Sequence, residues 1–175
     1  MRLPLSAGLE PEYNPRASTL NSLARIAARK NPAVSRIALE EIRSLAGNMP
    51  VRNQARVLEE LPEIYLQLGD QEDARNSLTE LVKIAGKLYA DDSDLNDPNQ
   101  AFKGMWPSAN LWRHCVALAA KLSPSPVQEI MEDIPDPEIR TFERVTFANS
   151  LLGVDIESLS TVEKHRKGIT VSVGL

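Results

Sequence analysis

The stretch LEELPEIYLQLGDQEDARNSLTELVKIA, residues 58–85, decides the fold class. Its apolar residues recur every three or four positions, which is the spacing of one helix face and not of a strand. Gly69 ends the first helix of this pattern, and Asp70 directly after it can cap a second one. Two amphipathic helices joined by so short a turn pack against each other antiparallel, so the stretch predicts a helical hairpin.

Similar capping and helix-breaking residues divide the rest of the chain into further helices. Asn31 and Pro32 end one helix and begin the next, because asparagine caps a helix and proline fits its first turn. Pro62 is expected to kink its helix or split it in two, because proline has no amide hydrogen to donate. The predicted helices cover about residues 18–30, 32–46, 51–68, 70–88, 108–122, 125–134, 136–152 and 160–167.

These helices group into two halves. Residues 1–15 hold three prolines and no helical spacing, which predicts an extended N-terminal arm before a first helical half over 16–90. Acidic and turn-forming residues fill 91–107 and predict a long acidic loop. A second helical half is expected over 108–168, and residues 169–175 are expected to form a tail.

Particular side chains test this helical pattern. Leu78 and Leu118 are central on their helices and are expected in the core. On the helix predicted over 136–152, the apolar spacing places Ile139, Phe142 and Val145 on the buried face. A substantial β-sheet, or exposed Leu78 and Leu118, would contradict the all-α interpretation.

The two halves share an internal sequence similarity. Shifted by 92 positions, Asn31-Pro32 meets Ser123-Pro124, and LEEI at 39–42 meets MEDI at 131–134. Because a cap and a proline coincide as well as apolar residues, we interpret the chain as two related halves of four helices each, stacked as a helical superhelix. A chance match between amphipathic helices is the alternative.

The stretch Leu58 to Ala85 also resembles one tetratricopeptide repeat. The residues that carry the resemblance are Leu58, Leu61 and Tyr65, the turn Gly69-Asp70, and then Ala74 and Leu78. Pro62 and Leu81 depart from the repeat, which has small residues there, and no proline closes the unit. HEAT-like hairpins fit nearly as well. The resemblance implies antiparallel hairpins stacked as an α-α superhelix, a concave face that binds peptides or partner proteins, and no catalytic residues.

Composition excludes several classes of function. The 20 basic and 24 acidic residues give a net charge of -4, so the chain has no broad attraction to a phosphate backbone and nucleic acid is not an expected partner. With Cys115 alone, neither an intrachain disulfide nor a cysteine-based zinc cluster can form. No stretch resembles a signal peptide or a membrane span, so we expect no membrane contact and, by default, a cytoplasmic location. No cofactor or metal is expected.

Two local patterns suggest chemistry, and each has a simpler interpretation. Cys115 beside His114 invites a nucleophile and base, but adjacent residues on a helix point about 100° apart. We therefore expect Cys115 to be a small buried side chain. Asp92, Asp94 and Asn96 match the first ligands of a calcium loop. The glycine and glutamate that such a loop needs later are missing, so a solvated acidic loop is the favoured interpretation.

Large aromatic side chains concentrate near the predicted loop. Phe102, Trp106 and Trp112 are candidate partner-binding residues, because aromatic anchors fill pockets at interfaces. Packing in the joint between the halves is the alternative, and we favour it because large apolar side chains seldom stay exposed. Tyr65 and Arg113 are further candidates for the wall of a binding groove.

The leading hypothesis is a non-enzymatic helical-repeat module that binds a protein or peptide. A small-molecule-binding protein or enzyme, with a site in a helical cavity near Trp106, His114 and Glu63, is the second. A structural or regulatory helical region of a larger assembly is the third. Partner identity and oligomeric state do not follow from the sequence.

Overall fold

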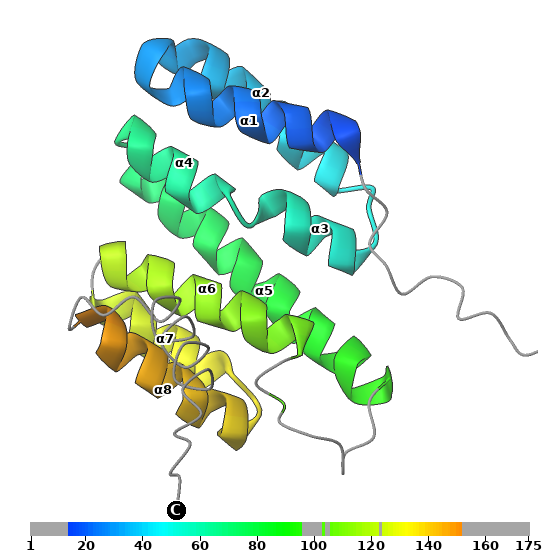
Figure 1. Ribbon diagram of the computed structural model, residues 1–175, viewed down its shortest axis with the longest axis vertical. Coiled ribbons are helices and arrows are strands. Elements are labelled where there is room, and N and C mark those ends of the chain that lie inside the picture. Colours follow the sequence, from blue (N-terminus) through cyan, green and yellow to red (C-terminus); the bar gives the residue numbers. More distant parts are fainter. Residues whose placement is uncertain (1–13, 96–102, 104–105, 123, 152–175) are drawn as a thin grey trace, which may run out of the picture.

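The computed structural model describes residues 14–95, 103, 106–122 and 124–151, which form helices and no strand (Figure 1). The all-α fold class is therefore confirmed. None of these helices has the length and apolar character needed to cross a bilayer. In chain order the helices are α1 (Pro15–Lys30), α2 (Pro32–Ala46), α3 (Val51–Leu58), α4 (Leu61–Leu68), α5 (Gln71–Leu95), α6 (Pro107–Leu122), α7 (Pro124–Asp133) and α8 (Pro137–Leu151).

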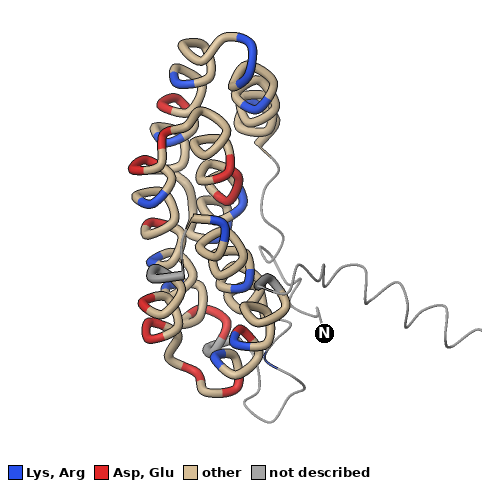
Figure 2. The backbone as a smooth tube through the Cα atoms, turned by 90° about the vertical axis from the view of Figure 1, so that its left-hand side faces the viewer, with Lys and Arg blue, Asp and Glu red and all other residues tan. Residues whose placement is uncertain are grey.

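The helices lie in two layers along an elongated stack (Figures 1 and 2). One layer contains α1, the α3–α4 pair, α6 and α8, and the other contains α2, α5 and α7. Antiparallel neighbours α1 and α2 pack closely at one end, α5 packs on both α4 and α6 in the middle, and α7 and α8 lie at the other end. Leu78 and Leu118 are buried in the core between these layers, as the apolar spacing predicts.

Prolines and polar caps set where the helices begin. The Asn14 side chain accepts a hydrogen bond from the amide of Ala17 at the start of α1. Asn31 ends α1 and caps α2, where its side chain accepts from the amide of Val34. Gly69, with φ of 80°, ends α4 in the left-handed conformation that favours glycine.

The internal sequence similarity coincides with the helix bounds. Pro15 and Pro107, which begin α1 and α6, are 92 residues apart, and so are Pro32 and Pro124, which begin α2 and α7. Both pairs therefore form hairpins with the same turn position and the same proline at the start of the second helix. Descent of the two halves from one unit stays a prediction.

The structure bears out one expected boundary and corrects another. The helix predicted over 51–68 is split at Glu59 and Glu60, which was one of the two outcomes expected from Pro62. The acidic loop predicted from residue 91 is wrong at its start, because α5 continues to Leu95. Asp92 is fully buried there, and its carboxylate pairs with Arg52 of α3.

The buried face predicted for the last long helix is only partly right, because Ile139 is fully buried as predicted but other members are not. Val145 is 56% exposed, whereas Glu143 and Thr146 are buried beside Ile139. The polar pair shares the i, i+4, i+7 spacing with Ile139, so an apolar count alone selected the wrong side of α8. The arm over 1–13, the helix predicted over 160–167 and the tail over 169–175 lie outside the described residues.

Candidate functional site

The two tryptophans, which were candidate anchors, are core residues, as the favoured packing interpretation expected. Trp112 is fully buried and Trp106 is 8% exposed. Both rings lie with their centroids 5.8 Å from the ring of Tyr89 on α5, so they fill the joint between α5 and α6. Neither can serve as the exposed anchor that the sequence suggested. Phe102 lies outside the described residues.

Tyr65 and Arg113 do not share a groove with them. Tyr65 on α4 is 5% exposed and lies beneath the Arg43 guanidinium, which is 5.1 Å from the ring centroid. Burial raises the pKa of Tyr65. Arg113 on α6 lies 4.6 Å from the ring of Phe142 on α8. The predicted partner-binding residues are therefore spread through the stack.

Arg113 also faces a buried carboxyl group that the sequence analysis missed. The Nε atom of Arg113 is 3.6 Å from Oε1 of Glu143, whose side chain is fully buried between α8 and α6. Burial raises the pKa of Glu143 to about 7, and Arg113 and Thr146 offset only part of that effect. A carboxyl group with this pKa changes charge near neutral pH.

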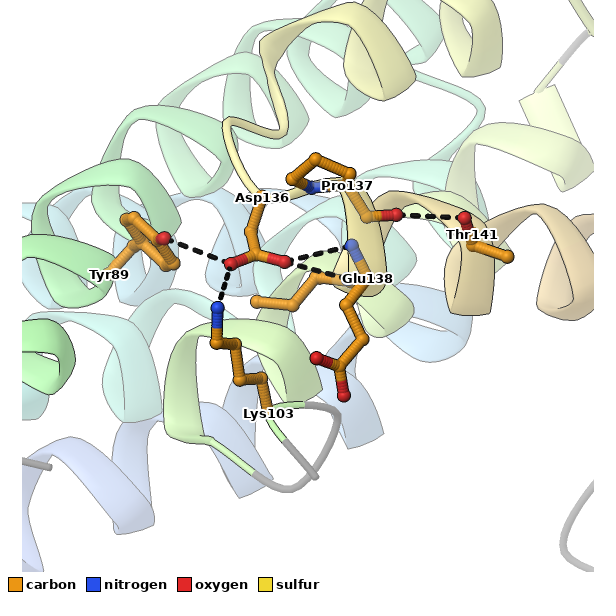
Figure 3. Close-up of polar contacts among 7 residues, drawn as sticks. Tyr89, Lys103, Asp136, Pro137, Glu138 and Thr141 are labelled. Atoms are coloured by element: carbon orange, nitrogen blue, oxygen red, sulfur yellow. Dashed lines mark hydrogen bonds and ion pairs between the residues drawn. The ribbon is translucent and has the colours of Figure 1, made fainter. Parts of the chain in front are cut away.

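A second buried acid, Asp136, connects three parts of the chain (Figure 3). Its Oδ2 accepts hydrogen bonds from Lys103 Nζ at 2.7 Å and the Tyr89 hydroxyl at 3.1 Å. Its Oδ1 accepts from the amides of Glu138 at 2.8 Å and Ile139 at 3.3 Å, at the start of α8. Burial favours the neutral acid, but these hydrogen bonds outweigh burial and hold the pKa of Asp136 below its usual range. With both oxygens occupied, Asp136 has a structural role and is a poor general base.

Asp92 plays a similar role between α3, α5 and α6. Its carboxylate pairs with Arg52 of α3 at 3.1 Å and accepts from the amide of Ser108, in the first turn of α6, at 2.9 Å. This buried pairing makes Asp92 unlike an open calcium ligand. No cluster of histidine, cysteine and acidic side chains suited to a metal ion is found in the described ranges.

The Cys115 and His114 side chains have separate environments. Cys115 is fully buried, and burial raises the pKa of its thiol. His114 Nε2 is 3.0 Å from the carbonyl oxygen of Glu59, so Nε2 carries the proton and donates it to that oxygen. The cavity suggested for a small molecule is not assembled either, because Trp106 packs on Tyr89 while Glu63 pairs with Lys121 at the surface.

A polar groove between α1 and α3 is the most coherent candidate surface. The groove has a volume of about 280 Å³. We define the polar groove by its lining residues: Asn14 directly before α1, Ser18, Asn21, Ser22 and Arg25 on α1, and Asn53, Arg56, Val57, Glu59 and Glu60 on α3 and the break after it. The α1 members recur at helical spacing, so amides and hydroxyls form one continuous stripe. With a rise of 1.5 Å per residue, that stripe is about 16 Å long.

The break between α3 and α4 forms one end of the polar groove. A helix interruption leaves carbonyl groups without their usual amide partners. Asn21 Nδ2 of α1 donates to the carbonyl oxygen of Val57 at 3.0 Å, and His114 of α6 donates to that of Glu59. Arg25 forms an ion pair with Glu60 across the groove. The neighbouring helices on both sides therefore hold this break in place.

Charge in the polar groove is balanced. Arg25 and Arg56 supply two positive charges and Glu59 and Glu60 two negative ones. Burial raises the pKa of Glu59, and the nearby His114 opposes that shift. A groove of this character favours a neutral polar ligand over a phosphate-rich one. Helical spacing of polar residues on α1 was the signal in the sequence that could have revealed it.

Comparison with known proteins adds no relative. No protein-family model, curated protein or solved structure matches the chain. The resemblance to tetratricopeptide repeats therefore stays a prediction, and function has to be argued from the surface itself.

Proposed function

We propose that the protein is a non-enzymatic helical-repeat module, with its hairpins stacked as a superhelix, that binds a partner protein or peptide in the polar groove. One observation carries the proposal: α1 and α3 align two stripes of hydrogen-bonding side chains along a groove about 16 Å long. An extended chain rises about 3.3 Å per residue, so the groove matches roughly five residues of a bound segment.

The character of the groove supports a peptide more than a compact organic ligand. Small-molecule sites are mostly apolar and largely enclosed. Apart from Val57, the polar groove is lined by amide, hydroxyl and charged side chains. Ser18 and Ser22 are short, so they leave room for a ligand along α1 without a large side chain in the way. A cytoplasmic location remains part of this proposal.

Selection of binding peptides from a random dodecapeptide library, with the full chain as bait, tests the proposal. Ser18 is exposed on the groove wall, so Ser18→Trp should obstruct the groove without disturbing the core. We expect this variant to lose affinity for the selected peptides by tenfold or more. Asn76→Trp, on an exposed position of α5 outside the groove, is the matched control and should bind as the wild type does.

Circular dichroism of both variants checks that the helices remain intact. Equal peptide affinity of the wild type and Ser18→Trp would exclude the polar groove as the binding site. Absence of any selected peptide at concentrations of about 100 µM would contradict peptide binding altogether.

A further inference from the structure

A second surface of the molecule is apolar and lies at the end of the stack. Among the described residues, the large hydrophobic side chains that are exposed are Leu23, Ile26, Ile37 and Val145. The first three belong to the α1–α2 hairpin, where Ile26 is 65% and Ile37 is 64% exposed. Exposed apolar side chains are ordinary when scattered singly, but a cluster on one face indicates an interaction surface.

Helical spacing gathers these side chains on one side of the hairpin. Leu23, Ile26 and Lys30 follow one another along α1, and Val34, Ile37 and Glu41 follow one another along α2, each at steps of three or four residues. We call this set the outer face. Ile26 lies five residues before the turn at Asn31 and Ile37 six residues after it, so the two lie at nearly the same level of the antiparallel hairpin.

Ion pairs show which way the outer face points. Arg16 of α1 pairs with Glu41 of α2 across the hairpin on this side. On the opposite side, Arg25 pairs with Glu60 and Arg36 with Asp70, both toward the next helices of the stack. The outer face therefore points away from α3, α4 and α5, at the end of the stack where α1 and α2 lie in Figure 1.

The inner side of the same hairpin packs against the next helices of the stack and shows how such a face is covered. Leu39 and Ile42 are fully buried in the core there, and arginine–carboxylate pairs lie around them at the edge. The outer face has an exposed isoleucine on each helix and a charged side chain four residues farther along, Lys30 on α1 and Glu41 on α2. Terminal units of a helical stack ordinarily have a polar outer surface. A second pair of helices with an apolar centre would complete this one.

The charges on the outer face are arranged for self-association. Lys30 lies four residues from Ile26 toward the turn, and Glu41 lies four residues from Ile37 away from it. Lys30 and Glu41 therefore occupy opposite corners at equal distances from the Ile26–Ile37 centre. A twofold axis in the plane of the face, perpendicular to the line joining these corners, places Lys30 of each copy over Glu41 of the other. Lys30 has no ion pair of its own within the described residues, whereas Glu41 already pairs with Arg16 of the same chain, so Lys30 of the second copy would join that pair.

We propose that the outer face of α1 and α2 is a homodimer interface, in which a second copy of this chain packs its Ile26–Ile37 centre against that of the first. The interface is isologous, so each favourable contact occurs twice. It is separate from the polar groove, which lies on the side of α1 that faces α3. Dimerisation would thus present two polar grooves on one assembly.

Analytical ultracentrifugation of the full chain tests the interface. We expect a monomer–dimer equilibrium for the wild type between about 1 and 100 µM. Ile26→Lys and Ile37→Lys replace exposed side chains, so they should leave the fold intact and weaken dimerisation by tenfold or more. Val145→Lys is the matched control, because it changes an equally apolar, exposed side chain on α8 and should leave the dimer unchanged. A wild type that stays monomeric throughout this range would overturn the proposal.

Charge exchange tests the symmetry. Lys30→Glu alone and Glu41→Lys alone each place like charges together twice, so we expect each variant to dimerise less well than the wild type. Mixing the two variants restores both opposite-charge contacts and should restore the dimer. Dimerisation of the mixture no better than that of either variant alone would exclude the proposed arrangement.

Cysteine cross-linking provides an independent measurement. Cys115 is buried, so Ile26→Cys adds an accessible thiol at the centre of the outer face. Mild oxidation should link two such chains, whereas Val145→Cys chains should stay unlinked. A dimer that forms equally well with Ile26→Lys, or links equally through Val145→Cys, would assign the association to another surface.

Discussion

Replacement of Glu143 by glutamine should change how stability depends on pH. The pKa of Glu143 is about 7 in the folded chain, against an ordinary value of 4.5. Between these values the unfolded chain has released the proton and the folded chain still holds it. Wild-type stability from this group is therefore fully present below pH 4.5 and is lost as the pH rises through 7. Each pH unit between two pKa values corresponds to about 1.4 kcal/mol, which gives a total of about 3 kcal/mol.

Glu143→Gln keeps the size of the side chain but removes its titration. The variant should gain stability relative to the wild type by about 2–3 kcal/mol when the pH rises from 5 to 8. For a chain of this length, that corresponds to roughly 5–10 °C in melting temperature. Because Arg113 is partly exposed, water can solvate it once its partner is neutral.

Urea unfolding at pH 5 and pH 8, followed by circular dichroism, measures the difference. Glu129→Gln on α7 is the control, because that side chain is exposed and its substitution should shift both curves equally. If the gap between Glu143→Gln and the wild type were the same at both pH values, then the buried carboxyl group would not titrate as the structure indicates.

Three further changes test the polar contacts that hold the stack together. Asn21→Ala leaves a carbonyl oxygen at the α3–α4 break without its donor, so it should lower the free energy of unfolding by about 1–3 kcal/mol. Ser22→Ala, at the exposed neighbouring position, should change that free energy little, and urea unfolding of both variants measures the difference. Asp92→Ala removes the cap of α6 together with a buried ion pair, so we expect a loss of about 3 kcal/mol by the same method. Lys103→Met removes a hydrogen bond that lowers the pKa of Asp136, so the stability that the wild type loses as the pH falls through that pKa should decrease less steeply in the variant. Melting temperatures between about pH 2 and pH 5 would contradict this if both proteins lost stability in parallel.

Helix positions could be predicted because their signals are local. Asn31-Pro32 and Gly69 act through backbone geometry within a single turn, and the structure places helix ends at both. The apolar spacing of α5 and α6 selected Leu78 and Leu118 correctly, since a continuous stripe faces the core in both helices. Local rules failed where distant residues decide the outcome. The end of α5 depends on partners of Asp92 that lie in α3 and α6.

The candidate site could not be predicted from residue type. Tryptophan is common both at interfaces and in cores; the sequence favoured packing for Trp106 and Trp112, and their burial against Tyr89 places both in the core. Glu143 was missed for the converse reason, because a carboxylate on a helix is ordinarily solvated. Its burial follows from the packing of α8 on α6, which no pattern within α8 reveals.

Pro62 links the fold to the proposed binding surface through a sequence of physical steps. Because Pro62 has no amide hydrogen to donate, it favours a break in the helix predicted over 51–68, which divides into α3 and α4. The division leaves carbonyl groups that need donors from elsewhere, and Asn21 and His114 supply them from α1 and α6. Because Asn21 is used in this way, the polar stripe of α1 must face α3, and the space between the two helices is lined by polar side chains. This break therefore forms one end of the groove to which we assign partner binding.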